Sequence, residues 1–397
     1  MTVTGHDRPG VTSTLFGALD GIDAAVADVE QVVIRDRLVL GVVLRCPASA
    51  ESRIRTALQN ALTPMGMDVE VQAGPDDDAP RGRGPGRSHV TVLGHPLRPA
   101  AIAAVAGCIA DWGGNIDRIV RIARYPVTAV ELEVSGADPA ELRQQLARTA
   151  ARVGVDVAVE RSGLHRRAKR LVVLDVDSTL IQGEVIEMLA EHAGCAPEVA
   201  AITDSAMRGE LDFAESLRAR VRLLAGLSAA VIDDVRRDLV LARGARTFVR
   251  TLKRLDYRIA IVSGGFTQVT DALVADLDID YSAANVLEIV DGRLTGEVVG
   301  DVVDRAGKAA ALVRFAEAAG VPVAQTVAIG DGANDLDMLA VAGLGIAYNA
   351  KPVVRVAADA ALNVPYLDAI LFLLGISREE IEEADAAEGI APETPPT

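Results

Sequence analysis

Two kinds of apolar pattern follow each other along the chain, and they meet near residue 171. Before it, short segments of alternating apolar and polar residues, typical of half-exposed strands, are separated by stretches with helical periodicity at 11–19 and 100–112. After it come short, continuous apolar runs at 171–174, 259–262, 326–329 and 344–347. Such runs are typical of strands buried on both faces. We therefore expect small α+β domains followed by an α/β domain.

The N-terminal part is predicted to contain two copies of one module. The segment 74–88 is rich in Gly, Pro, Asp and Arg and almost free of apolar residues, which predicts a flexible linker. On its two sides, Thr-Val-Thr-Gly-His recurs as Thr-Val-Leu-Gly-His, so that Gly5 and Gly94 are 94 − 5 = 89 residues apart. This offset indicates an internal duplication. We expect two βαββαβ domains, at 1–73 and 89–162, with an unusually short first strand before Gly5.

The segment 163–384 is predicted to form a Rossmann-like parallel sheet covered by helices. Between its first two apolar runs, residues 185–243 show helical periodicity and no comparable strand, which predicts a helical cap. Asp291-Gly292 is a signal for a tight hairpin. Residues 385–397 are acidic and end in Pro-Pro-Thr, so a disordered tail is expected there.

Composition narrows the class of partner. A net charge of −16 argues against nucleic-acid binding, and the basic cluster at Arg166, Arg167, Lys169 and Arg170 is predicted to be a solvated hinge between domains rather than a binding patch. The three cysteines match neither a disulfide framework nor a metal-ligand spacing. No leader pattern and no run long enough to cross a membrane occur, so a cytoplasmic protein without membrane partners is expected.

Polar signatures follow the apolar runs where parallel strands end. Asp175 and Asp177 follow the first run, Ser263-Gly264 the second, and Gly-Asp-Gly-Ala-Asn-Asp at 330–335 the third, while Lys308 lies between the last two. Reactive groups gather at this edge of an open parallel sheet. Two carboxylates in such proximity favour a hard cation such as Mg²⁺.

These four ordered motifs resemble those of the haloacid dehalogenase superfamily. The resemblance implies that Asp175 attacks phosphorus to form an aspartyl phosphate and that Asp177 serves as general acid and base. It also implies which residues bind the metal and the substrate. Mg²⁺ would be held by Asp175, the backbone carbonyl of Asp177 and Asp331. The phosphorylated substrate would be bound by Ser263, Gly264, Lys308 and Asn334, and Asp335 would orient Lys308 or metal-bound water.

The segments 181–187 and 207–220 resemble phosphoserine phosphatases. By that resemblance Glu184 would receive the substrate ammonium, Arg220 would bind its carboxylate bidentately, and Met207 and Phe213 would exclude water. The implied reaction, O-phospho-L-serine to L-serine and phosphate, is the last step of serine biosynthesis. The residues alone leave plainer interpretations open: a helix N-terminal charge for Glu184, a solvated Arg220, and core packing for Met207 and Phe213. Phosphoryl transfer to an alcohol, another small phosphate ester, and an amino-acid sensor with vestigial catalysis are the alternatives in function.

The turn Gly-His-Asp-Arg-Pro-Gly at 5–10 resembles the strand-to-helix turn of ACT domains, and 94–99 is a degenerate version. ACT domains commonly pair and bind amino acids at their interface, which implies serine as a regulatory ligand and a homodimer through this region. Backbone N–H groups left free at a helix start suit a carboxylate, although a plain tight turn would have the same sequence. The candidate regulatory residues are Gly5, Asp7, Gly10, Gly94 and Asn115.

Overall fold

The computed structural model describes residues 1–391 except 75–85, 164–165, 167 and 208–210. Contacts divide the chain into two compact units, Met1–Gly82 and Arg83–Thr397, and each is described by itself. The first residues of the predicted linker therefore fall at the end of unit 1, and its central part, 75–85, lies outside the described residues.

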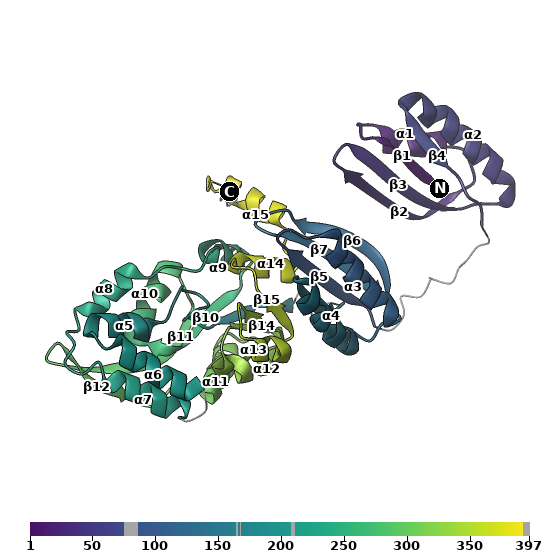
Figure 1. Cartoon of the computed structure of the whole chain (residues 1–397). Coiled ribbons are helices and arrows are strands. Elements are labelled where there is room, and N and C mark those ends of the chain that lie inside the picture. Colours follow the sequence, from purple (N-terminus) through teal and green to yellow (C-terminus); the bar gives the residue numbers. More distant parts are fainter. Residues whose placement is uncertain (75–85, 164–165, 167, 208–210, 392–397) are drawn as a thin grey trace. The chain divides into compact units, whose positions relative to one another are not determined.

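Unit 1 is a sheet of antiparallel strands covered by helices on one face (Figure 1). Among its described residues the sheet has four strands in the order β2-β3-β1-β4. The elements are β1 (Thr2–His6), α1 (Val11–Ala18), β2 (Ala25–Ile34), β3 (Arg37–Arg45), η1 (Ala48–Ala50), α2 (Glu51–Leu62), η2 (Thr63–Met65) and β4 (Met67–Glu70). The first strand is short, as predicted: β1 has five residues, whereas the equivalent β5 (Ser88–Gly94) has seven. It is nevertheless a central strand, paired with β3 on one side and β4 on the other.

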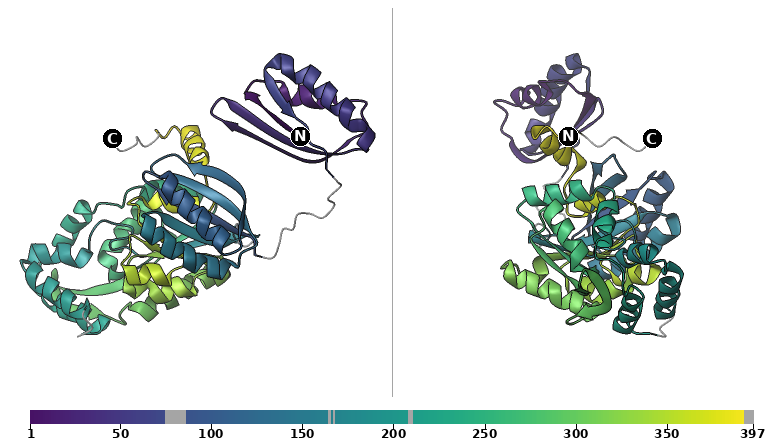
Figure 2. Two further views of the ribbon diagram at one scale, coloured as in Figure 1. Left: turned by 45° about the vertical axis from the view of Figure 1, so that its right-hand side comes forward. Right: turned by 90° about the vertical axis from the view of Figure 1, so that its left-hand side faces the viewer.

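Unit 2 begins with the same order of elements, which confirms the predicted duplication. These elements are β5 (Ser88–Gly94), α3 (Pro99–Asp111), β6 (Asn115–Ala123), β7 (Thr128–Ser135), α4 (Pro139–Val153) and β8 (Asp156–Arg161). Both α3 and α4 pack on one face of these strands, where Val105, Ile109, Leu142 and Leu146 form the core (Figures 1 and 2). Strand β5 starts at Ser88, so the predicted linker extends one residue too far.

The rest of unit 2 is built on parallel strands, as predicted. The strands are β9 (Leu171–Leu174), β10 (Arg258–Phe266), β11 (Tyr281–Val290), β12 (Arg293–Val299), β13 (Thr326–Gly330), β14 (Gly345–Tyr348) and β15 (Ala360–Leu362). The helices of the segment expected to form a cap are α5 (Val185–Ala193), α6 (Ala196–Met207), α7 (Phe213–Arg222) and α8 (Val231–Asp238). The remaining helices and 3-10 turns are α9 (Ala245–Arg254), α10 (Thr267–Leu277), α11 (Arg305–Ala318), η4 (Val323–Gln325), η5 (Ala333–Asp335), α12 (Leu336–Val341), α13 (Pro352–Ala357), η6 (Leu367–Ala369), α14 (Ile370–Leu373) and α15 (Arg378–Ala387).

Strand β9 shows why the continuous apolar runs form the centre of the sheet. Leu171 and Val173 enter the core on one face, and Val172 and Leu174 enter the core on the other. All four side chains are fully buried. The predicted hairpin is also confirmed: β11 and β12 are joined by Asp291 and Gly292, both with positive φ, at 49° and 73°.

The sheet of the second α+β domain and the parallel sheet are continuous. Strand β15 pairs antiparallel with β8 through Ala360 and Ala158, so the described residues form one sheet in the order β12-β11-β10-β9-β13-β14-β15-β8-β5-β7-β6. Beside this junction, buried Asp156 accepts hydrogen bonds from Asn363 N at 2.7 Å and Asn363 Nδ2 at 2.6 Å. No pattern in the sequence predicted this junction.

The prediction that the basic cluster is solvated holds only in part, because Arg170 is exposed whereas Arg166 and Lys169 are not. The Arg166 side chain is 7% exposed, donates from Nε to Glu160 Oε2 at 2.9 Å, and pairs with Glu131 of β7. Lys169 is buried and donates to the carbonyl of Ala324 at 3.1 Å. Arg167 lies outside the described residues. The side chains of Arg166 and Lys169 thus stabilise the domain junction instead of facing solvent.

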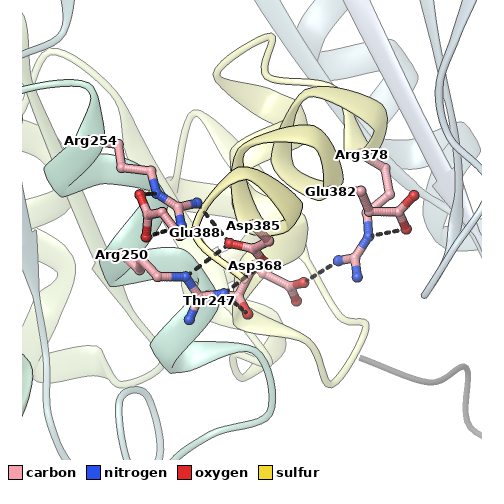
Figure 3. A network of polar contacts seen from close by, with 8 residues as sticks. All are labelled: Thr247, Arg250, Arg254, Asp368, Arg378, Glu382, Asp385 and Glu388. Atoms are coloured by element: carbon pink, nitrogen blue, oxygen red, sulfur yellow. Dashed lines mark hydrogen bonds and ion pairs between the residues drawn. The ribbon is translucent and has the colours of Figure 1, made fainter. Parts of the chain in front are cut away.

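Helix α15 docks on α9 through a network of ion pairs (Figure 3). Arg250 Nη2 lies 2.8 Å from Asp385 Oδ2, Arg254 Nη1 lies 2.7 Å from Asp385 Oδ1, and Arg378 Nη1 lies 3.1 Å from Asp368 Oδ2. The prediction of a disordered tail from residue 385 is therefore wrong for 385–387, which are helical. Residues 392–397 lie outside the described part. In the part of the chain that the structure describes, no helix is long and apolar enough to cross a membrane.

Candidate active site

Asp175 lies directly after β9, at the carboxyl edge of the parallel strands. Its backbone N–H donates to the carbonyl of Ile329 in β13 at 2.9 Å, and its Oδ1 accepts from the N–H of Val176 at 2.8 Å. Only 3% of the residue is exposed. The carboxylate is therefore held in one orientation at the point where β9 and β13 end.

Lys308, on α11, provides the positive charge beside this carboxylate. Its Nζ lies 2.7 Å from Asp175 Oδ1 and 2.8 Å from Asp335 Oδ1, and the side chain is fully buried. Burial alone would lower the pKa of Lys308, but the two carboxylates outweigh it and raise the pKa above its ordinary value. Burial and the negative charge of Asp335 raise the pKa of Asp175. Neighbouring carboxylates thus raise the pKa of both groups, although burial is the largest cause for Asp175.

A third carboxylate completes an acidic cluster. Oxygen atoms of Asp175, Asp331 and Asp335 lie within 4.8 Å of one another. Asp331 accepts a hydrogen bond from Thr179 Oγ1 at 3.2 Å, and burial together with the charge of Asp335 raises the pKa of Asp331 to about 6. Hard oxygen donors with uncompensated negative charge fit a divalent cation such as Mg²⁺.

Asp177 has a different set of contacts from Asp175. Its Oδ2 accepts from Ser263 Oγ at 3.0 Å, and its Oδ1 accepts from the N–H of Val185 at 2.8 Å. Burial raises the pKa of Asp177, which favours the protonated form that a general acid requires. Ser263 Oγ also accepts from the N–H of Gly265 at 2.7 Å, so the residue expected to bind a phosphoryl group holds the candidate general acid.

The helical segment 185–243 reaches this edge of the sheet through Phe213, the first residue of α7. A Cβ added to Gly264 would lie 2.9 Å from Phe213 Cζ, so the aromatic ring packs directly on the irregular last residues of β10. Asp212 fixes the start of α7 by accepting from the N–H of Glu215 at 2.7 Å. Met207 is the last residue of α6, and its side chain lies outside the described part of the chain.

Glu184 and Arg220 bring opposite charges to the same neighbourhood. Glu184 Oε1 accepts from Ser178 Oγ at 3.0 Å, and burial and the charge of Asp177 raise the pKa of Glu184 to about 7. Burial lowers the pKa of Arg220, while the charges of Glu184 and Asp177 favour its cationic form. Asn334 is half-buried in η5, where its Oδ1 lies against Gly332.

Asn285 is a buried polar residue that the sequence did not single out. Its Nδ2 donates to the carbonyl of Gly264 at 2.8 Å, and its Oδ1 accepts from the N–H of Val303 at 2.8 Å. It thereby ties the last residues of β10 to the segment that leads into α11 and Lys308. The signal available in the sequence was weak, since an amide within a strand has no motif of its own.

The candidate regulatory residues divide into two groups. Asp7 and Gly10 line a hollow of about 410 Å³ at the start of α1, with Thr12, Ser13 and Gln31. Gly5 has a packing role, because an added Cβ would lie 2.6 Å from Met67 Sδ.

In the second copy, Gly94 and Asn115 do not meet. Gly94 pairs with Thr128 at one end of β7, whereas Asn115 pairs with Ser135 at the other end. At about 3.3 Å per residue, the two positions are roughly 20 Å apart along that strand. These two residues therefore do not line one pocket within a single domain. Asn115 Nδ2 donates instead to Asp117 Oδ1 at 2.7 Å.

Family comparisons agree with this geometry. Residues 172–340 match the model for haloacid dehalogenase-like hydrolases, and residues 1–72 and 87–160 match models for ACT domains. Fold and site together define a hydrolase of the haloacid dehalogenase type that carries two ACT domains. The chain is 60% identical to a phosphoserine phosphatase of Streptomyces coelicolor, over 97% of this chain and 94% of that protein. It belongs to the phosphoserine phosphatase family.

Three further relatives support the assignment. Phosphoserine phosphatase SerB2 of Mycobacterium tuberculosis is 55% identical over 98% of this chain and 95% of its own length. Among solved structures, a probable phosphoserine phosphatase from Vibrio cholerae is 35% identical, with a TM-score of 0.58 over 74% of this chain and 88% of that chain. A haloacid dehalogenase family hydrolase from Salmonella enterica is 29% identical, with a TM-score of 0.64 over 72% of this chain and 98% of that chain.

Proposed function

We propose that this protein hydrolyses O-phospho-L-serine to L-serine and phosphate, the last step of serine biosynthesis, through a phospho-aspartyl intermediate on Asp175. The observation that carries the mechanism is the contrast between two neighbouring carboxylates. Asp175 is paired with the ammonium of Lys308, whereas Asp177 is held by the hydroxyl of Ser263 and a backbone N–H. Carboxylates with such different partners suit a nucleophile and a general acid.

In the first step, an oxygen of Asp175 forms a bond to phosphorus while the bond between phosphorus and the seryl oxygen breaks. Asp177 gives its proton to the departing seryl oxygen, which leaves as the hydroxyl of serine. In the second step, Asp177 takes a proton from a water molecule that attacks the aspartyl phosphate, and phosphate and free Asp175 result. Lys308, whose Nζ lies 2.7 Å from Asp175 Oδ1, and Ser263-Gly264 near the end of β10 would bind phosphoryl oxygens.

The acidic cluster supports a divalent cation, and we propose Mg²⁺. Asp175, Asp331 and the backbone carbonyl of Asp177 would hold it, and Asp335 would keep Lys308 in place through their 2.8 Å contact. When bound, the cation would offset negative charge on the transferring phosphoryl group.

Substrate choice is assigned to residues on the cap side of the site. Glu184 would receive the ammonium of phosphoserine, Arg220 would bind its carboxylate, and Phe213 and Met207 would exclude water. Two features support this assignment: both charged side chains are half-buried, and Phe213 packs on Gly264 near the end of β10. Glu184 is the N-cap residue of α5 but makes no side-chain capping bond, which disfavours a purely helix-stabilising role.

The test is phosphate release from a panel of small phosphate esters, with and without Mg²⁺. We expect phosphoserine to be preferred, Mg²⁺ to be required, and Asp175→Asn to abolish turnover without loss of fold. The matched control is Asp337→Asn, which removes a carboxylate exposed to 43% in α12 and should leave turnover intact. Preference for another ester, or transfer of phosphate to an added alcohol such as homoserine in place of water, would overturn the substrate or the reaction assignment.

We propose that the ACT domains bind serine and mediate a homodimer. Two edge strands support the second part: every residue of β2 is exposed, and most of β6 is exposed. Such edges have unpaired backbone groups that a second copy can pair with. Calorimetry with serine and sedimentation of the full chain test both parts, and a monomer that binds no amino acid would reject them.

A further inference from the structure

We infer that Ser178 is a positioning residue that gives the site its preference for a substrate bearing an ammonium group, by holding the carboxylate of Glu184. This inference rests on the proposed role of Glu184 in phosphoserine recognition. Ser178 directly follows Asp177, yet nothing in the proposed mechanism uses its side chain.

The backbone around Ser178 folds the chain back onto itself. Its N–H donates to the carbonyl of Gly183 at 3.0 Å, and this contact closes the loop between β9 and α5. The closure brings Ser178 Oγ to 3.0 Å from Glu184 Oε1, where the hydroxyl donates a hydrogen bond. The loop therefore brings the Ser178 side chain into contact with the carboxylate of Glu184, which lies six residues later in the sequence.

The conformation of Ser178 indicates that its hydroxyl is needed. Its φ is +56°, in the left-handed region that glycine adopts without cost and that a residue with a Cβ adopts with strain. A serine at this position gives up stability that a glycine would keep. In return, the serine side chain makes the hydrogen bond to Glu184, the residue proposed to bind the substrate ammonium.

The charges around Glu184 explain what the bond does. Burial and the carboxylates of Asp177, Asp331 and Glu187 all favour the protonated form of Glu184, whereas the hydroxyl of Ser178 favours the ionised form. Only an ionised Glu184 attracts an ammonium group. Because the bond engages Oε1, it also orients the carboxylate and leaves Oε2 for the substrate.

The experiment compares two substrates that differ only in this group. Phosphoserine and 3-phosphoglycerate have the same carbon skeleton, phosphate and carboxylate, with a hydroxyl in place of the ammonium in the second. We expect Ser178→Ala and Ser178→Gly to raise KM for phosphoserine about 10-fold, as expected for a lost hydrogen bond to a charged group, with little change in kcat. The kcat/KM or inhibition constant of 3-phosphoglycerate should stay the same.

Two variants are needed because they separate the hydroxyl from the backbone. Alanine keeps the strained φ and glycine relieves it, so equal losses of preference in both assign the effect to the hydroxyl. If both compounds lose equally, or if Ser178→Gly behaves as the unmodified protein, Ser178 only shapes the loop and the inference is wrong.

Glu184→Gln distinguishes this failure from failure of the proposed function. We expect it to abolish the preference for phosphoserine, and Ser178→Ala should add no further loss in the double variant. If Glu184→Gln leaves the preference unchanged, the proposed role of Glu184 fails. If Glu184→Gln removes the preference but Ser178→Ala does not, only the role of Ser178 is rejected.

Discussion

The pair Arg378–Asp368, which anchors the start of α15, offers a sharp test of how the catalytic domain is held together. Both side chains are nearly inaccessible, at 3% and 1% exposed, and the two charged atoms lie 3.1 Å apart. The guanidinium also lies 4.7 Å from the ring centroid of Tyr125. A Cβ added to Gly244 would overlap the Asp368 carboxylate, so the surroundings leave little room to readjust.

Replacing Arg378 with Met keeps most of the side-chain volume but removes the guanidinium that pairs with the buried carboxylate of Asp368. Removal of one member of a buried ion pair costs about 3–5 kcal/mol in free energy of unfolding. The matched control is Arg246→Met, whose pair with Asp276 is 57% and 48% exposed and should contribute less than about 1 kcal/mol.

Urea unfolding followed by the fluorescence of Trp112 measures the effect, because this is the single tryptophan of the chain and lies in the same unit. Asp368→Asn removes the second charge, so the double variant should be markedly more stable than the sum of the two single losses predicts. The reasoning is refuted if Arg378→Met costs no more than Arg246→Met, or if the two losses simply add.

Three further outcomes are expected. Lys308→Met should lower kcat by at least about 100-fold, since it removes the charge beside the nucleophile, and circular dichroism should check that the fold remains. Removal of divalent cations with a chelator should abolish phosphate release, and added Mg²⁺ should restore it, whereas failure of Mg²⁺ to restore it would reject the assignment of the cluster. Because the pKa of Glu184 is raised from its ordinary 4.5 to about 7, folding takes up a proton between these values, and stability of the metal-free protein should fall as pH rises through that window. Glu184→Gln should reduce this loss in pH-dependent urea unfolding; an unchanged slope would contradict the raised pKa.

The parts of the fold that could be predicted are those encoded in local pattern. Four consecutive apolar residues at 171–174 specify a strand buried on both faces, and the polar residues after each run mark the edge of the sheet where the site forms. The duplication was visible for the same reason, as a repeated short sequence around Gly5 and Gly94.

The parts that could not be predicted depend on partners far away in sequence. Strand β15 has only three residues, and its partner Ala158 lies 360 − 158 = 202 residues before Ala360. Asp385 belongs to an acidic stretch that suggests disorder, but it lies in α15, where it pairs with Arg250 and Arg254 of α9. The sequence shows which residues are charged, but it does not show which residue of opposite charge each of them will contact in the fold.

The shared sheet has a consequence for how the chain can be divided. The two ACT domains have the same order of elements, yet only the second contributes its strands to the catalytic sheet, so the copies are not interchangeable. A fragment that starts after β8 would expose the backbone of β15 as a new edge and remove Asp156 from Asn363. A fragment that keeps this edge covered therefore begins near Ser88, and the second ACT domain shares one continuous sheet with the catalytic strands.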